Sequence, residues 1–430
     1  MDFINRIDAE SDELIMSTIK SEYGFMLQIG ALFANLRPKW RILSIIQFTI
    51  YTGMVISHLG LFIKTLSINY KDTNSALQTL HYGSLVSITF VILISFPLNR
   101  PVFVKLIRIV GNNYYTYSDG LQSDLVNKWK NDIRKIKIIL LILIPCYLFF
   151  CAVSLIFISP MIDTYTGVEI IEETYTDGIY TKLPLKLWYP FIIDTQFKHI
   201  MTLCLQVFIA GIVASVIACA DLLMIFVSQG IAVQMKILRN SIQNIENRAG
   251  DFYAKKFGEL NRKDIYSNKN YMKMINFCIK ENVQHHIVLL KAFNNWYLLQ
   301  KWPMAYALVE GSLIIALSLI GFVMGETRLG DQFLSLLLLV AEVATFALFC
   351  FVGQQMSDLS EGMLGDLYNL NWMKWNKSCQ LSFLIVKEFM KNPLELKAGG
   401  LKTMNLSTFA SIMNGAYSYF NLIYAYKGDS

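Results

Sequence analysis

Residues 197–231 read FKHIMTLCLQVFIAGIVASVIACADLLMIFVSQGI. This stretch is apolar over almost its whole length. A helix of about 20 apolar residues is enough to cross the hydrocarbon core of a bilayer, which is about 30 Å thick. The stretch therefore predicts a membrane-spanning helix that tilts or projects well beyond the membrane.

The rest of the chain has the same character. Of its 430 residues, 54% are hydrophobic and 16% are charged, whereas soluble domains carry about 25% charged residues. Such an apolar excess suits a lipid-facing surface, so we expect an all-α membrane protein with seven transmembrane helices. The six further spans are expected at 42–68, 75–96, 136–159, 298–323, 331–356 and 404–426.

The long connection after residue 231 is polar, but its apolar residues, such as Ile275, Ile279 and Val283, recur at helical spacing. We therefore expect helices that continue out of the membrane into a cytoplasmic anchor. The chain is divided into 1–231 with four spans and half of a ligand pocket, 232–297 as a cytoplasmic segment, 298–356 with two spans, 357–403 as an anchor segment and 404–430 as the last helix.

Basic residues are distributed unevenly between the two sides of the expected membrane. Thirty of the 38 Lys and Arg residues lie before residue 42 or in the connections 97–137, 232–297 and 357–403. Basic residues near spans stay in the cytoplasm. The N-terminus is therefore expected inside and the C-terminus outside, as in a multi-pass protein of the cell membrane that contacts lipid.

No motif indicates catalysis or a cofactor. The sequence contains no GxSxG, HExxH, Walker or Rossmann pattern, so we expect neither an enzyme nor a cofactor. The seven cysteines form no CxxC pair, and no zinc spacing occurs. His285 and His286 lack a partner at helical spacing, so we interpret them as a solvated or interfacial pair rather than a metal site. No basic run suggests nucleic-acid binding.

Two other membrane classes fit less well. A G-protein-coupled receptor has its N-terminus outside, and DRY and NPxxY motifs are missing at the relevant helix ends. A transporter would use ionisable side chains within its spans as a proton relay, and Asp221, Glu310 and Glu342 are candidates. Broken helices and inverted repeats, which are usual in transporters, are not visible. Hydrogen bonding between helices is the alternative role of these carboxylates.

The last expected span carries one small, polar stripe. At 3.6 residues per turn, its members fall within an arc of about 80°. A water-filled pore closed by an apolar constriction needs such a stripe, and close helix packing through small residues is the alternative. The stripe consists of Ser411, Gly415, Ser418, Leu422 and Tyr426.

The outer halves of four spans (75–96, 136–159, 197–231 and 331–356) mix aromatic and small polar residues. An apolar cavity with a few polar groups binds small molecules, although plain core packing gives similar patterns. We place no Lys, Arg or carboxylate in this pocket, so ionic recognition is not expected. The pocket candidates are His81, Ser84, Leu85, Phe150, Cys151, Ser154, Met201, Cys204, Leu205, Phe208, Phe333 and Leu337.

The C-terminal region resembles insect odorant receptors. The similarity also includes Trp188-Tyr189-Pro190-Phe191 and the run through Gly353, Tyr368 and Trp372, while the layout matches over the whole chain. The motifs that carry it are Pro393-Leu394, Lys397-Ala398-Gly399-Gly400, Leu406-Ser407, Phe409 and Ala416-Tyr417-Ser418-Tyr419-Phe420.

The resemblance implies an odorant-gated, nonselective cation channel subunit in sensory dendrites. In that family four subunits surround one pore, and a subunit that binds a small volatile odorant assembles with the odorant receptor co-receptor, Orco. The co-receptor's last helix reads roughly TYFMVLVQLK, against 418–427 here; Leu422 and Tyr426 match its gate positions, and Ala425 replaces the adjacent glutamine. This difference implies an odorant-binding subunit. A gustatory-type channel of the same topology is the alternative.

The orientation predicts which connections antibodies can reach. An epitope inserted near Glu172, in the connection between the third and fourth spans, should stain intact cells because that connection is expected outside. The same epitope in 232–297 should stain only after permeabilisation. The reverse staining pattern would mean that the chain is inserted the other way round.

Overall fold

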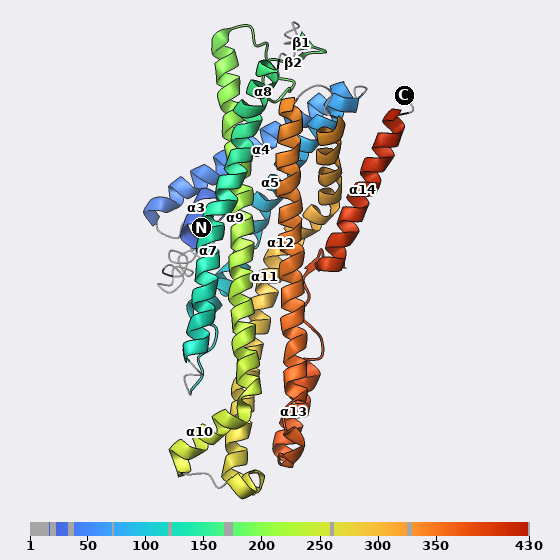
Figure 1. The fold of residues 1–430 in the computed structure, drawn as a ribbon. Helices are drawn as coiled ribbons and strands as arrows, with labels where there is room; N and C mark the ends of the chain where they lie inside the picture. Colours follow the sequence, from blue (N-terminus) through green and yellow to red (C-terminus); the bar gives the residue numbers. More distant parts are fainter. Residues whose placement is uncertain are drawn as a thin grey trace.

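The computed structural model describes residues 17, 23–32, 38–70, 73–118, 123–166, 175–258, 262–324 and 329–428, and it is almost entirely helical (Figure 1). The α-helices are α3 (Gly24–Ile29), α4 (Pro38–Asn69), α5 (Thr73–Leu98), α6 (Arg100–Gly111), α7 (Ser123–Val153), α8 (Ser159–Tyr165), α9 (Gln196–Gln243), α10 (Ile245–Phe257), α11 (Lys269–Met324), α12 (Leu329–Tyr368), α13 (Lys377–Phe389) and α14 (Leu406–Gly428). Shorter helical turns are η2 (Ser154–Ile158), η3 (Arg262–Ser267) and η4 (Trp372–Lys374). Two antiparallel pairs of short strands are β1 (Tyr175–Thr176) with β2 (Ile179–Tyr180), and β3 (Lys397–Ala398) with β4 (Lys402–Thr403).

Six described helical segments are long and apolar enough to cross a membrane, which confirms the all-α membrane fold. The expected seventh span corresponds to α14, whose 23 residues give a length of about 35 Å, although α14 is more polar than the other six. The six segments are Arg41–Asn69, Ser75–Leu98, Val126–Tyr165, Gln196–Gln243, Lys269–Phe322 and Leu329–Tyr368.

Two helices are far longer than a bilayer is thick. Helices α9 and α11 have 48 and 56 residues, or about 72 and 84 Å at 1.5 Å per residue. They run alongside α12 to the end of the molecule where α10 and α13 lie, opposite the end with β1 and β2 (Figure 1). The described residues of the connection 232–297 are thus mostly helical, as their apolar spacing predicted.

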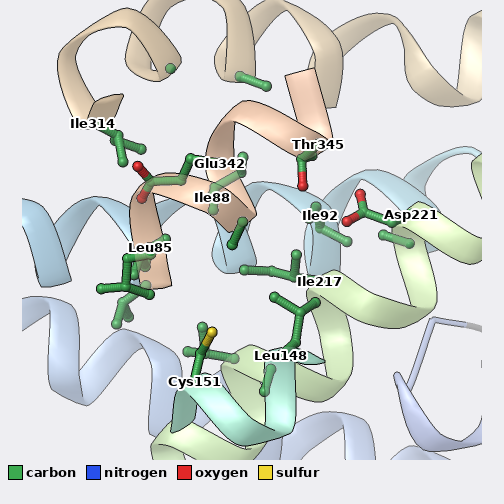
Figure 2. A pocket seen from close by; sticks show the side chains of 18 of the residues that line it. Leu85, Ile88, Ile92, Leu148, Cys151, Ile217, Asp221, Ile314, Glu342 and Thr345 are labelled. Carbon is green, nitrogen blue, oxygen red and sulfur yellow. The ribbon is translucent and has the colours of Figure 1, made fainter. Parts of the chain in front are cut away.

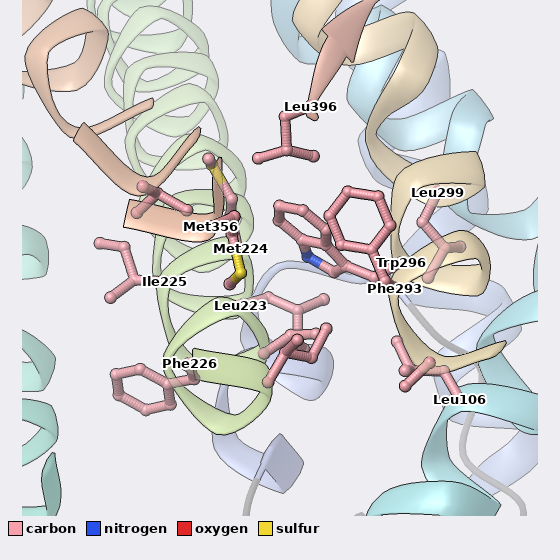
Figure 3. Close-up of a cluster of buried hydrophobic side chains, with 14 of the residues drawn as sticks. Leu106, Leu223, Met224, Ile225, Phe226, Phe293, Trp296, Leu299, Met356 and Leu396 are labelled. Carbon is pink, nitrogen blue, oxygen red and sulfur yellow. The ribbon is translucent and has the colours of Figure 1, made fainter. Parts of the chain in front are cut away.

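The long helices are joined by a large apolar core. Trp296 and Phe293 on α11 point toward Leu223 and Met224 on α9, and Met356 from α12 closes the cluster (Figure 3). Full burial of a large apolar side chain contributes about 1.5–3 kcal/mol. These contacts make α9, α11 and α12 one packed unit.

The connection between the second and third spans contains an element that was not expected. Helix α6 lies within 97–137 and packs against α11 with Phe103, Leu106 and Ile107 buried. From the sequence, this connection was expected only to be a basic segment on the cytoplasmic side. Its apolar residues at 103, 106 and 107 carry the helical spacing that would have indicated α6.

A buried polar cluster joins α9, α10, α11 and residues 112–118. Arg248 Nη2 lies 2.5 Å from Glu281 Oε2, and these side chains are 5% and 4% exposed. The Arg248 guanidinium also lies 4.7 Å from the ring centre of Tyr117. His285 is buried and its Nδ1 is 2.8 Å from the Tyr117 hydroxyl, and His286 is buried as well. The expectation of a solvated or interfacial histidine pair is therefore wrong, because this connection folds into packed helices.

The C-terminal motif positions α14. Gly399 and Gly400 adopt φ values of +60° and +84° in the turn between β3 and β4, a conformation that favours glycine. The Gly399 N–H donates to the Lys301 carbonyl of α11 at 3.2 Å. A Cβ at Gly353 of α12 would lie 1.9 Å from the Met404 carbonyl oxygen, so a glycine is needed there. These contacts hold the start of α14 against α11 and α12.

The buried ion pair gives a stability prediction. Arg248→Ala leaves the Glu281 carboxylate buried without its cation, which should lower the free energy of unfolding by about 3–5 kcal/mol. Unfolding of the full-length chain in detergent would measure this loss. The control is Lys391→Ala, because the pair Lys391–Glu388 is 66% and 76% exposed and exposed pairs contribute at most about 1 kcal/mol. Equal losses in the two variants would contradict a structural role for the buried pair.

Candidate ligand cavity and last helix

An apolar cavity of about 180 Å³ lies between α5, α7, α9, α11 and α12 (Figure 2). Its walls are mainly aliphatic and aromatic side chains, such as Ile88, Leu148 and Ile217. Cavities of this kind bind small molecules through apolar contact and are oriented by a few polar groups. Helices α5, α7, α9 and α12 correspond to the four spans that were expected to form a pocket, and α11 is a fifth helix that was not expected there.

The polar groups of the cavity include two carboxylates. Glu342 of α12 is part of a hydrogen-bonded group, with His81 Nε2 at 3.2 Å from its Oε1 and the Ser318 hydroxyl donating to its Oε2 at 2.8 Å. Asp221 of α9 also lines the cavity, and so does Thr345 of α12 (Figure 2). Ionic recognition of the ligand was not expected, because no carboxylate was placed in the pocket from the sequence. The structure shows that this premise is wrong, since Asp221 and Glu342 both line the cavity.

A segment before α9 covers the cavity from one side. Leu185 lines the cavity, and Gln206 of α9 holds its backbone by accepting from the Leu185 N–H at 3.1 Å and donating to its carbonyl at 2.7 Å. Gln206 also donates to the Tyr189 hydroxyl at 2.7 Å, and burial raises the pKa of Tyr189 to about 12, so the phenol stays neutral. The Trp188 N–H donates to the Thr65 hydroxyl at 2.9 Å. The motif around Trp188 and Tyr189 thus fixes a cover over the cavity.

The structure brings part of the predicted pocket together. Leu85 and Cys151 line the cavity. His81 does not line it but is buried beside it through its contact with Glu342. Ser84 is buried with its hydroxyl donating to the Leu80 carbonyl, and Ser154 is buried at the start of η2.

Other predicted pocket residues lie outside this cavity. On α9 the cavity side carries Ile209, Val213 and Ile217, and the predicted α9 residues project from other faces of the helix. Both sides of α9 are apolar, so hydropathy does not distinguish the side that faces the cavity. Among the predicted pocket residues outside the cavity, Phe333 and Leu337 are half-buried. The side chains of the others are exposed on the surface of this chain: Phe150, Met201, Cys204, Leu205 and Phe208.

The contribution of α11 was not predicted from the sequence. Pro303, Ala307 and Gly311 of this helix line the cavity. A Cβ at Gly311 would lie 1.9 Å from the Phe346 ring, so the glycine allows α11 and α12 to approach. The glycine and Glu310 within an apolar span were the available signals, but neither specifies which helix face meets the cavity.

The last helix packs through one face and leaves the other free. Ile412 and Ala416 of α14 are buried against α11 and α12. The polar stripe lies on the other side: Ser411, Ser418 and Leu422 are exposed and Gly415 is half-buried, and the neighbouring Ala425 is exposed as well. The side chain of Tyr426 is outside the described part of the structure. Packing within this chain therefore does not account for the stripe.

Comparison with known proteins identifies the family. The family model described as 7tm Odorant receptor matches residues 72–417. Local similarity links the chain to odorant receptors 33a (26% identity over 78 residues; 18% of this chain, 21% of that protein) and 94a (24% over 120 residues; 27% and 30%) of Drosophila melanogaster. The chain thus aligns with less than a third of each of these relatives.

Solved structures show the same fold. The insect olfactory receptor OR5 from Machilis hrabei superposes with a TM-score of 0.73 at 13% identity, covering 98% of this chain and 97% of that one. Its complex with eugenol superposes with a TM-score of 0.72 at 12% identity, covering 94% and 96%. The match of the family model across most of the sequence agrees with this fold. The chain belongs to the insect odorant receptor family, a family of membrane channels and not of enzymes.

Proposed function

We propose that this chain is the odorant-binding subunit of an odorant-gated, nonselective cation channel. It binds a small volatile molecule in the cavity between α5, α7, α9, α11 and α12, and it opens a pore that it forms with the co-receptor Orco in a heterotetramer. The chain is placed in the cell membrane of sensory dendrites with its N-terminus in the cytoplasm. The observation that carries the proposal is an apolar cavity between the long helices of an odorant receptor.

Two further observations support it. The solved olfactory receptor complex with eugenol has the same fold, so that fold accommodates a small organic molecule. The exposed stripe of α14 has small and hydroxyl side chains at 411, 415 and 418, followed by Leu422. A pore wall needs this order, because the small polar side chains favour water and an apolar ring at the mouth excludes it in the closed state.

Electrical recording tests the proposal. Cells expressing the chain with Orco should give cation currents to some members of a volatile panel, and cells expressing the chain alone should give none. Ile217→Trp fills the cavity and should lower the potency of an active odorant at least about tenfold, since buried apolar contact contributes about 0.8 kcal/mol per methylene. Phe208→Ala is the control, because Phe208 lies on the exposed side of α9. A loss of potency in Phe208→Ala alone would place the ligand on the outer face instead.

The stripe of α14 gives a second prediction. Leu422→Ser should raise the current without odorant or change ion permeability, because a polar ring no longer excludes water. Cysteines at 418 and 422 should react with water-soluble thiol reagents while odorant is present, whereas a cysteine at 416 should not, because Ala416 is 1% exposed. Reaction at 416 but not at 418 would mean that the stripe is a packing face.

A further inference from the structure

The carboxylates within the spans differ in their partners. Glu310 accepts hydrogen bonds from the hydroxyls of Ser87 and Tyr306. Glu342 is paired with His81 and accepts from Ser318. Asp221 is only 8% exposed, and within the described residues it has neither a hydrogen bond nor an ion pair. Among these three acidic residues, Asp221 alone has a carboxylate with no hydrogen-bond partner in the described part of the structure.

The cavity residues around Asp221 provide no positive charge. Asp221 lines the cavity together with Ile217, Ala220 and Met224 of the same helix, and no Lys, Arg or His is among the cavity-lining residues. Isolating an ionised carboxylate in an apolar setting costs several kcal/mol unless a cation or hydrogen-bond donors meet it. The described residues supply neither, so the Asp221 carboxylate is available to a cation or donor carried by the molecule that occupies the cavity.

We propose that the cavity binds a small amine, whose ammonium group pairs with Asp221 while its hydrocarbon body packs against the apolar walls. This inference rests on the proposed function and names the ligand class for the same cavity. Thr345 lies at the same end of the cavity as Asp221 in the view of Figure 2, and its hydroxyl accepts a second N–H of the ligand. Aliphatic ammonium groups are ionised at neutral pH, as for Lys with a pKa of about 10.4.

The same geometry discriminates against other volatile classes. A hydrocarbon fills the cavity without satisfying Asp221, and an alcohol supplies one neutral hydrogen bond. A carboxylic acid would ionise beside two carboxylates, Asp221 and Glu342, which disfavours it. Because charge-assisted hydrogen bonds are about twice as strong as neutral ones, amines should bind ahead of alcohols of the same shape.

The test uses three molecules of one shape: benzylamine, benzyl alcohol and toluene. Each is added to the purified full-length chain in detergent, and the shift in unfolding temperature is measured over a range of concentrations, since a ligand that binds the folded state stabilises it. Benzylamine should bind at least about tenfold more tightly than benzyl alcohol, from the strength of hydrogen bonds to charged groups. Asp221→Asn should remove this advantage and leave benzyl alcohol and toluene within about threefold of their wild-type affinities.

Glu310→Gln is the matched control, because it converts a carboxylate to an amide in a span outside the cavity lining. It should keep the preference for benzylamine even if it changes overall stability. An equal affinity for benzylamine and benzyl alcohol in the wild-type chain would overturn the proposal, as would a benzylamine affinity that Asp221→Asn does not change or no binding of benzylamine. The currents with Orco report separately on channel function, so a channel that opens to other volatiles while benzylamine fails to bind refutes the ligand class alone.

Discussion

A hydrocarbon layer offers no hydrogen-bond partner to a peptide group, and the rest of this structure follows from that constraint. Each crossing segment satisfies its backbone within a helix, so the protein becomes a set of long helices that differ mainly in which faces they bury. Helices α9 and α11 are about 72 and 84 Å long, and they pack against each other in a large apolar core. There Trp296, Leu223 and Met356 provide the apolar contact that holds the molecule together.

The same constraint makes polar groups inside the bundle informative. Glu310 is tied to α5 through Ser87, and Glu342 is tied to α5 and α11 through His81 and Ser318, so hydrogen bonding between helices accounts for both carboxylates. Asp221 has no such partner among the described residues and faces the cavity. The cost of burying an ionised carboxylate falls when a cation or hydrogen-bond donors meet it, and the proposed amine would supply both.

Glycines and turn geometry connect the cavity to the last helix. Gly311 allows α11 and α12 to approach beside the cavity, where Phe346 of α12 forms part of the wall. Gly353, Gly399 and Gly400 fix the start of α14 on the same two helices. Helices α11 and α12 therefore contact both the cavity and the base of α14, which is the connection that the proposed gating by a ligand requires.

The sequence by itself determined the fold class, because hydropathy and helical spacing are local properties that lipid enforces segment by segment. It also determined that 232–297 continues as helices and that the C-terminal motif marks the family. The tertiary structure decided which faces meet. On α9 both Ile217 and Phe208 are apolar, and only the packing of α5, α7, α11 and α12 around one side places Ile217 in the cavity and Phe208 outside it. The position of Asp221 in a cavity wall has the same origin, because an ionisable residue in an apolar segment indicates burial but not the neighbours that surround it.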